Sequence, residues 1–377
     1  MIKIGLRNNL LYPLLLIIFT FFRRILSIII SEVLEFQGSL SFLTLLMFLS
    51  EFIAGLFVYL YQLKFFKNNK KTNRKQSSIK YIVSNNEMSY SDSAFKIFVL
   101  IFISTYFDFV VFVLTSYYFP KFENLSKSLN IRLGSALTLS SFIFSYFLLR
   151  IKIYNHHKFA LVIISICLLT TIITEILFNQ NWSDSLIILL NIISFSFTAY
   201  QNNIEKYLFE YNYINPFKML MLEGAFGLVL AIIYSFLDNP INNIIEFLHN
   251  KPKIQFIYLM ICLILYIILS AGRNSYKFLT IRIYSPMTKA IADSFLDPLI
   301  ILYYFIKEYD FKIEGKINIM YFILNLVLSI ISVFSGCVYS ELLVIYLFNL
   351  EKDTHYEVSK RAKEIEKIDD DIELISS

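Results

Sequence analysis

The chain has 377 residues, of which 57% are hydrophobic and only 17% charged, whereas a soluble domain carries about 25% charged residues. This composition excludes an ordinary soluble domain and favours a protein that resides in a lipid bilayer. The formal net charge of +5 is small, and the basic residues cluster beside apolar segments, so they indicate membrane orientation rather than nucleic-acid binding.

About ten apolar segments follow one another along the chain, each near the roughly 20 residues that a helix needs to cross a bilayer. The short connections between them contain mostly Asn, Asp, Pro or Lys, which are typical of loops. A polar, basic loop is expected over 66–93, and a charged tail over 350–377. The expected spans are 10–30, 40–63, 95–119, 129–149, 158–177, 185–205, 216–237, 255–280, 285–306 and 319–345.

Lysine and arginine residues are distributed unequally between the two sides of the membrane. If the N-terminus is cytosolic, the cytosolic side carries 22 of the 34 and the opposite side 8. The remaining four lie within spans: Arg23, Arg24, Arg273 and Lys289. Because cytosolic loops carry the excess of positive charge, both termini are predicted to be cytosolic.

One internal match supports two halves of five spans each. Arg132 precedes Arg150 by 18 residues, Lys289 precedes Lys307 by the same spacing, and the pairs bracket the fourth and ninth spans. Because five is odd, the halves would be inverted repeats, with a binding site near the membrane midplane between them. We therefore expect an all-α membrane fold divided into a first repeat, a second repeat and a tail, at 1–182, 183–349 and 350–377.

Ionisable side chains within spans are costly unless they face protein or water, so they mark candidate functional sites. The candidates outside the ninth span are Arg24, Glu51, Asp108, Glu223, Arg273 and the neighbouring Asn274. These residues predict a polar, water-filled pathway. The alternative is a set of buried ion pairs that only fix helix packing, in which Glu51 or Asp108 neutralises Arg23 or Arg24.

The ninth span is the richest in polar residues. Lys289, Asp293 and Asp297 are four residues apart in succession, which places them within about 80° of one helix face. Lys289 and Asp293 are expected to pair. Pro298 cannot donate a backbone hydrogen bond, so a kink is expected there.

No motif of an enzyme is present in the sequence, which lacks HExxH, a Gly-rich phosphate loop and a nucleophile elbow. The histidines are expected in loops or the tail, and the cysteines have neither metal nor disulfide spacing. We therefore expect no catalytic activity, no cofactor and no metal. The four histidines are His156, His157, His249 and His355.

Three stretches resemble a known family. They are Met47-Phe-Leu-Ser-Glu-Phe52, the region from Glu205-Lys-Tyr through Pro216 to Glu223-Gly-Ala-Phe-Gly227, and Thr288-Lys-Ala-Ile-Ala-Asp-Ser294. Together they resemble the drug/metabolite transporter superfamily, specifically the nucleotide-sugar-transporter-like solute carrier family 35, subfamily F. The resemblance implies ten helices in two inverted repeats, transport in intracellular membranes and often phosphate-bearing substrates.

The sequence and the resemblance together predict a secondary transporter that moves a small polar, anionic metabolite by alternating access, with a nucleotide sugar as the first guess. Basic residues would attract phosphate or carboxylate, and acidic residues would balance them or carry a proton. One alternative is a proton-coupled carrier of a neutral or cationic metabolite, and another is a non-transporting scaffold or receptor. The expected substrate-binding residues are Lys289, Asp293, Arg24, Glu51, Asp108, Arg273, Asn274 and Glu223.

The expected partners are the lipid bilayer and a small-molecule substrate, with no nucleic acid, and a homodimer is left open. The expected location is an endomembrane such as that of the Golgi, the endoplasmic reticulum or a lysosome-like compartment.

Overall fold

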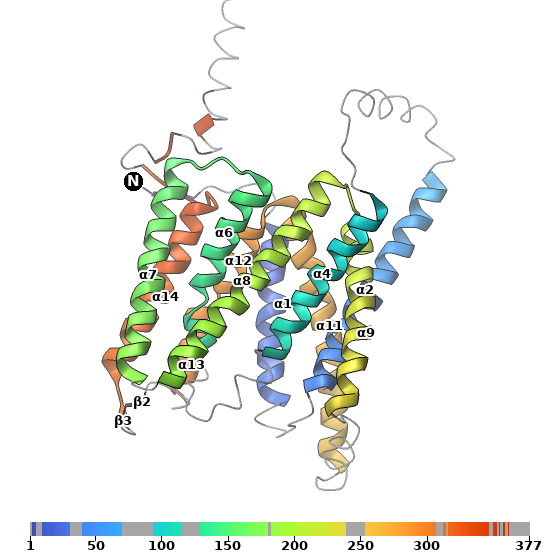
Figure 1. Cartoon of the computed structure of the whole chain (residues 1–377), viewed down its shortest axis with the longest axis horizontal. Helices are drawn as coiled ribbons and strands as arrows, with labels where there is room; N and C mark the ends of the chain where they lie inside the picture. The colour runs from blue at the N-terminus through green and yellow to red at the C-terminus, as the bar shows by residue number, and fades with distance from the viewer. Residues whose placement is uncertain are drawn as a thin grey trace, which may run out of the picture.

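A computed structural model describes twelve helices and four short strands (Figure 1). The described residues are 2–4, 10–30, 40–69, 93–114, 129–179, 182–238, 253–306, 312–313, 316–346, 350–352, 354, 357–358 and 361. The helices are α1 (Leu11–Ile28), α2 (Leu40–Asn69), α4 (Ala94–Val113), α5 (Leu129–Arg132), α6 (Ser135–Leu149), α7 (Asn155–Asn179), α8 (Trp182–Tyr211), α9 (Pro216–Asp238), α11 (Lys253–Ile283), α12 (Pro286–Ser294), α13 (Asp297–Ile306) and α14 (Ile319–Tyr339). The strands are β1 (Ile2–Ile4), β2 (Lys312–Ile313), β3 (Lys316–Ile317) and β4 (Leu343–Ile345).

Eight of the helices in the described ranges are long and apolar enough to cross a membrane: α1, α2, α4, α7, α8, α9, α11 and α14. Large apolar side chains project outward, as Phe147 and Phe236 do with 71% and 79% of their surface exposed. Polar residues such as Asn202 and Glu205 are buried instead. This distribution is the reverse of a soluble protein and suits contact with lipid. The chain is an all-α, multi-pass membrane protein.

The two other predicted spans, 129–149 and 285–306, are interrupted rather than continuous. The first is split into α5 and α6 at Leu133 and Gly134, and the second into α12 and α13 just before Asp297. The kink expected at Pro298 takes the form of a break between α12 and α13, because this residue has no N–H to donate to the carbonyl of Ser294, where α12 ends.

The two interruptions face each other. A Cβ added to Gly134 would lie 2.6 Å from Oδ2 of Asp297 and 3.5 Å from Oγ of Ser294. A glycine at this position lets the α5–α6 break approach the Asp297 carboxylate this closely, whereas the distance to Ser294 is ordinary van der Waals contact.

The helices pack in a pattern that pairs the two halves of the chain. Helix α2 lies along α9, α7 along α14, α1 along α11, and α4 along α8. Helix α6 also packs on α8, and α12 on α1. Exchanging α1 with α8, α2 with α9, α4 with α11, α6 with α12 and α7 with α14 turns these six contacts into one another, although other contacts, such as that of α11 with α8, have no counterpart among the main helix contacts.

The contact between α2 and α9 is unusually close. A Cβ on Gly55 would lie 2.4 Å from the backbone nitrogen of Met221, and one on Gly224 would lie 2.3 Å from that of Phe52. Each glycine thus faces the residue three positions before the other. The backbones touch, as in helix pairs of membrane proteins that meet through small residues.

The start of the chain and the segment after the last helix lie on one face of the bundle, here termed the terminal face. Strand β1 pairs antiparallel with β4, with Lys3 opposite Val344. The β2–β3 hairpin, which precedes α14, lies at the opposite end (Figure 1). Most of the predicted loop 66–93 and tail 350–377 lie outside the described residues.

Candidate functional site

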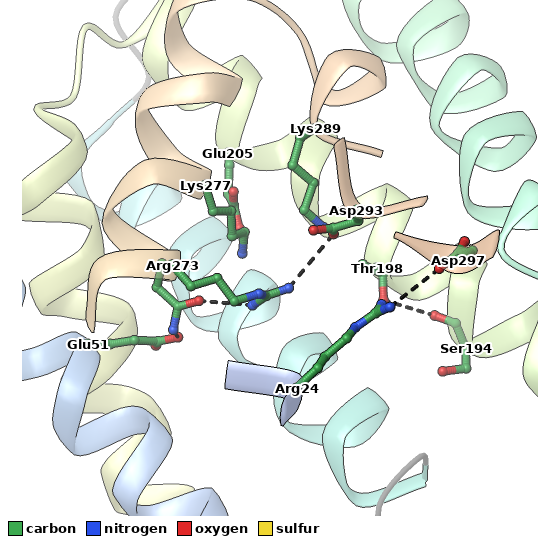
Figure 2. A network of polar contacts seen from close by, with 11 residues as sticks. Arg24, Glu51, Ser194, Thr198, Glu205, Arg273, Lys277, Lys289, Asp293 and Asp297 are labelled. Carbon is green, nitrogen blue, oxygen red and sulfur yellow. Dashed lines mark hydrogen bonds and ion pairs between the residues drawn. The ribbon is translucent and has the colours of Figure 1, made fainter. Parts of the chain in front are cut away.

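A cavity of about 210 Å³ lies among the helices of both halves. Its charged lining comprises five basic and four acidic side chains, so it carries a surplus of one positive charge if all are ionised. Uncharged polar groups from α8 also line it. The charged residues are Arg23, Arg24, Glu51, Asp108, Arg273, Lys277, Lys289, Asp293 and Asp297, and Figure 2 labels all of them except Arg23 and Asp108.

Helix α12 supplies an ion pair in which one carboxylate serves two cations. Nζ of Lys289 lies 2.9 Å from Oδ2 of Asp293, as the spacing of four residues predicts. Nη2 of Arg273, from α11, lies 3.8 Å from the same oxygen. The helix is fixed at its start by Ser285, whose hydroxyl accepts a hydrogen bond from the N–H of Thr288.

Glu51 of α2 is tied to α11 through Asn274. The side-chain amide of Asn274 donates to Oε1 of Glu51 over 2.6 Å, and Arg273 donates to the amide oxygen of Asn274 over 3.0 Å. Oε2 of Glu51 is buried with no hydrogen-bond partner among the described residues. Asn274 is therefore a positioning residue behind the cavity wall, and Glu51 presents a carboxylate oxygen that remains available.

The two interrupted segments also meet the first helix. Nη1 of Arg24 lies 3.4 Å from Oδ1 of Asp297 (Figure 2), so Asp297 rather than Glu51 or Asp108 balances this arginine. The side chains of Arg23 and Asp108 line the cavity without a hydrogen bond or ion pair to any described residue. The cavity thus holds one cation, Arg23, and one carboxylate, Asp108, whose side chains form no hydrogen bond or ion pair with the described residues.

The sequence did not identify Lys277, whose Nζ lies 2.7 Å from Oε1 of the buried Glu205. The eighth span was expected to end at 280, which placed this lysine beside the cytosol. Helix α11 continues to Ile283, so Lys277 lies inside and lines the cavity. Its spacing of four residues from Arg273 places both on one helix face and could have revealed it.

Two predicted site residues do not line the cavity: Asn274, which contacts the lining residues Glu51 and Arg273, and Glu223, which has no such contact. Glu223 is buried between α9 and α4, where its Oε1 accepts a hydrogen bond of 2.7 Å from the hydroxyl of Ser104. It is not part of the lining of the central cavity. Its contacts are those of a residue that holds two helices together.

Arg132 does not line the central cavity either. It forms a two-pronged ion pair with Glu175 of α7, at 2.8 Å and 3.0 Å. Glu175, which lies in the last two turns of α7, is fully buried. A minor cavity of about 10 Å³ beside this pair shares Ser294 and Asp297 with the central one.

Neither models of known protein families nor curated protein sequences match this chain. What defines it is therefore its architecture, which is that of a multi-pass membrane protein with a charged cavity enclosed by its helices.

Proposed function

We propose that this protein is a secondary transporter of a small polar, anionic metabolite that works by alternating access. One observation carries the proposal, namely that nine charged side chains line a single cavity inside the helix bundle. Ionisable groups at such depth are costly and are typical of substrate pathways. A scaffold would bury its charges in dry contacts, whereas Lys289 and Asp293 border open space.

Two features support a fold of ten crossings in two inverted repeats, as in the drug/metabolite transporters. The α5–α6 and α12–α13 segments occupy corresponding places in the two halves, and interrupted helices at such places are common at transporter sites. The exchange of neighbours described above, together with the reciprocal contacts of Gly55 and Gly224, is the pattern that a two-fold relation produces.

The arginines of the lining favour an anion, even though Glu205 neutralises Lys277 and so cancels the surplus positive charge of the lining. Arginine binds phosphate or carboxylate through paired donors, and Arg23 is not engaged by the described residues. Arg24 and Arg273 would release Asp297 and Asp293 as the substrate replaces those carboxylates.

The volume limits the size of the substrate in this conformation. Pockets for drug-sized ligands measure about 300–1,000 Å³. A cavity of about 210 Å³ therefore suits a small phosphate- or carboxylate-bearing metabolite, and a nucleotide sugar requires further opening.

A proton-coupled carrier of a neutral or cationic metabolite is the second candidate. The free Oε2 of Glu51 and the unengaged Asp108 favour it, because a carboxylate in such a site can take up a proton. The two candidates differ in the charge of the compounds that should bind in the cavity: anions for the first, and neutral or cationic compounds for the second.

The basic residues along the chain support an orientation with both termini in the cytosol. The resemblance supports an intracellular membrane as the location. Protease accessibility of tags at the two ends, in sealed vesicles, tests the orientation. Cleavage of one tag from outside while the other is protected would refute it.

Uptake into proteoliposomes tests the transport proposal. Purified protein is offered radiolabelled organic phosphates, carboxylates, nucleotide sugars and amines, with internal unlabelled substrate to drive exchange. We expect exchange of an anion, and we expect Lys289→Ala to reduce it more than Asp293→Ala does. Glu210→Gln is the matched control, because Glu210 is 48% exposed and does not line the cavity. Exchange of amines alone would support the second candidate, and no exchange of any class would refute transport.

A further inference from the structure

A second cluster of chemically active side chains lies outside the cavity, on the terminal face. His156 and His157 form the first turn of α7, and Glu341 follows the end of α14. None of the three belongs to either cavity. His156 and Glu341 are 185 residues apart in sequence. The packing of α7 along α14 brings them together.

The three residues are arranged like ligands of one ion. One ligand atom from each lies within 4.8 Å of the other two. Nε2 of His156 and Oε1 of Glu341 are 3.4 Å apart. Bonds of about 2.0–2.1 Å to a tetrahedral zinc ion place neighbouring ligand atoms about 3.4 Å apart. The distance between the ligand atoms of His156 and Glu341 therefore already suits zinc. The distances from these atoms to the ligand atom of His157 must shorten by at most about 1.4 Å.

Apart from its 3.4 Å contact with Glu341, His156 has no polar partner among the described residues. Its side chain is 2% exposed, and neither ring nitrogen has a hydrogen-bond partner among the described residues. Buried polar atoms nearly always have a partner, so an imidazole in this state indicates that a group is missing from its surroundings.

The backbone at Glu341 points to the same conclusion. This residue has φ of 59°, in the left-handed region that is costly for a residue other than glycine or asparagine. Helices usually end with glycine at such a position, and here α14 ends with a glutamate whose carboxylate faces His156. Backbone strain of this kind concentrates at functional sites. The carboxyl end of α14 also carries a partial negative charge, which favours a cation.

Neighbouring groups hold the second histidine. The ring of Tyr339 stacks on that of His157 at a centroid distance of 4.4 Å, and the two histidine rings are 4.1 Å apart. Nδ1 of His157 accepts a hydrogen bond of 3.3 Å from the backbone N–H of Tyr154. If a metal bound Nε2 of His157, the ring proton would lie on Nδ1. The long hydrogen bond from Tyr154 would then be lost, and the metal–nitrogen bond would take its place in holding the ring.

We propose that His156, His157 and Glu341 bind a divalent transition metal of the zinc class, with water as a fourth ligand, and so fasten the start of α7 to the end of α14. Two imidazoles and one carboxylate form a recognised zinc ligand set. Magnesium and calcium prefer oxygen ligands alone, which excludes them here. The site is independent of the transport proposal, because it needs no residue of the cavity.

Metal binding to the full-length protein in detergent tests the proposal. Chelator-treated protein is titrated with zinc by calorimetry, and its unfolding temperature is measured with zinc, with magnesium and with chelator. We expect one zinc per chain and an unfolding temperature that rises with zinc concentration but not with magnesium.

Two variants separate binding from folding. Glu341→Gly removes a ligand and also relieves the strained backbone, so it should not lower the unfolding temperature in chelator, while zinc affinity falls at least about tenfold. His156→Ala should weaken zinc binding to a similar extent, and Glu210→Gln should leave it unchanged. Zinc binding that is absent from the native protein, or retained by Glu341→Gly, would overturn the proposal even if His156→Ala failed to fold.

Discussion

The coupling free energy of the ion pair between Lys289 and Asp293 reports how strongly water screens charges in the central cavity. At 2.9 Å and an effective dielectric constant of about 20, their gross attraction is about 6 kcal/mol. The cost of removing both charges from water offsets much of this attraction. Arg273, at 3.8 Å from the same carboxylate, also remains as a partner when the lysine is replaced. We therefore expect a coupling free energy of about 2 kcal/mol in a double-mutant cycle.

The cycle comprises Lys289→Met, Asp293→Asn and the double variant, each measured by equilibrium unfolding in detergent. The control is a second cycle, Lys206→Met with Glu210→Gln. That pair has the same spacing and a distance of 3.0 Å, but its carboxylate is 48% exposed. Water reaches this carboxylate although Lys206 itself is buried, so we expect the coupling to lie nearer the value for exposed pairs at this spacing, about 0.3–0.5 kcal/mol. Equal coupling in the two cycles would refute the idea that the cavity residues are poorly solvated.

Three further predictions follow from contacts elsewhere. Gly55→Ala should lower the free energy of unfolding by about 2 kcal/mol, because the added Cβ would clash with the backbone of α9. Gly336→Ala should lower it by less, because its Cβ would meet only side-chain atoms. Equilibrium unfolding in detergent measures both. Replacing Arg132 or Glu175 alone should cost about 3–5 kcal/mol, and replacing both with apolar residues should cost less than either, as thermal unfolding would reveal. Glu51→Gln keeps a hydrogen-bond acceptor but removes the charge, so under the proton-coupled candidate it should flatten the pH dependence of uptake, and an unchanged profile would assign Glu51 a structural role.

Local patterns in the sequence predicted the features that depend on neighbouring residues. Long apolar runs identified the eight uninterrupted membrane helices, because length and hydropathy suffice for that. The spacing of Lys289 and Asp293 identified their ion pair. Pro298 identified one break because its effect on the helix is intrinsic to the residue.

Features that depend on distant partners were not predicted. Arg132 and Glu175 meet across 43 positions, so neither showed from its neighbours that it would be buried and paired. The break at Gly134 lies against Asp297, which is far away in sequence. The histidines were expected to be loop residues because nothing near them signals Glu341.

The glycine contact between α2 and α9 restricts how the halves can move. Where two backbones touch, sliding by one residue, about 1.5 Å, would drive a side chain into the gap. Rotation about the contact meets no such obstacle. We expect this point to act as a pivot, with the largest displacements at α7 and α14 on the far side of the bundle (Figure 1). Under the transport proposal, a chemical cross-link across α2 and α9 should therefore leave uptake intact, whereas one between α6 and α12 should arrest it.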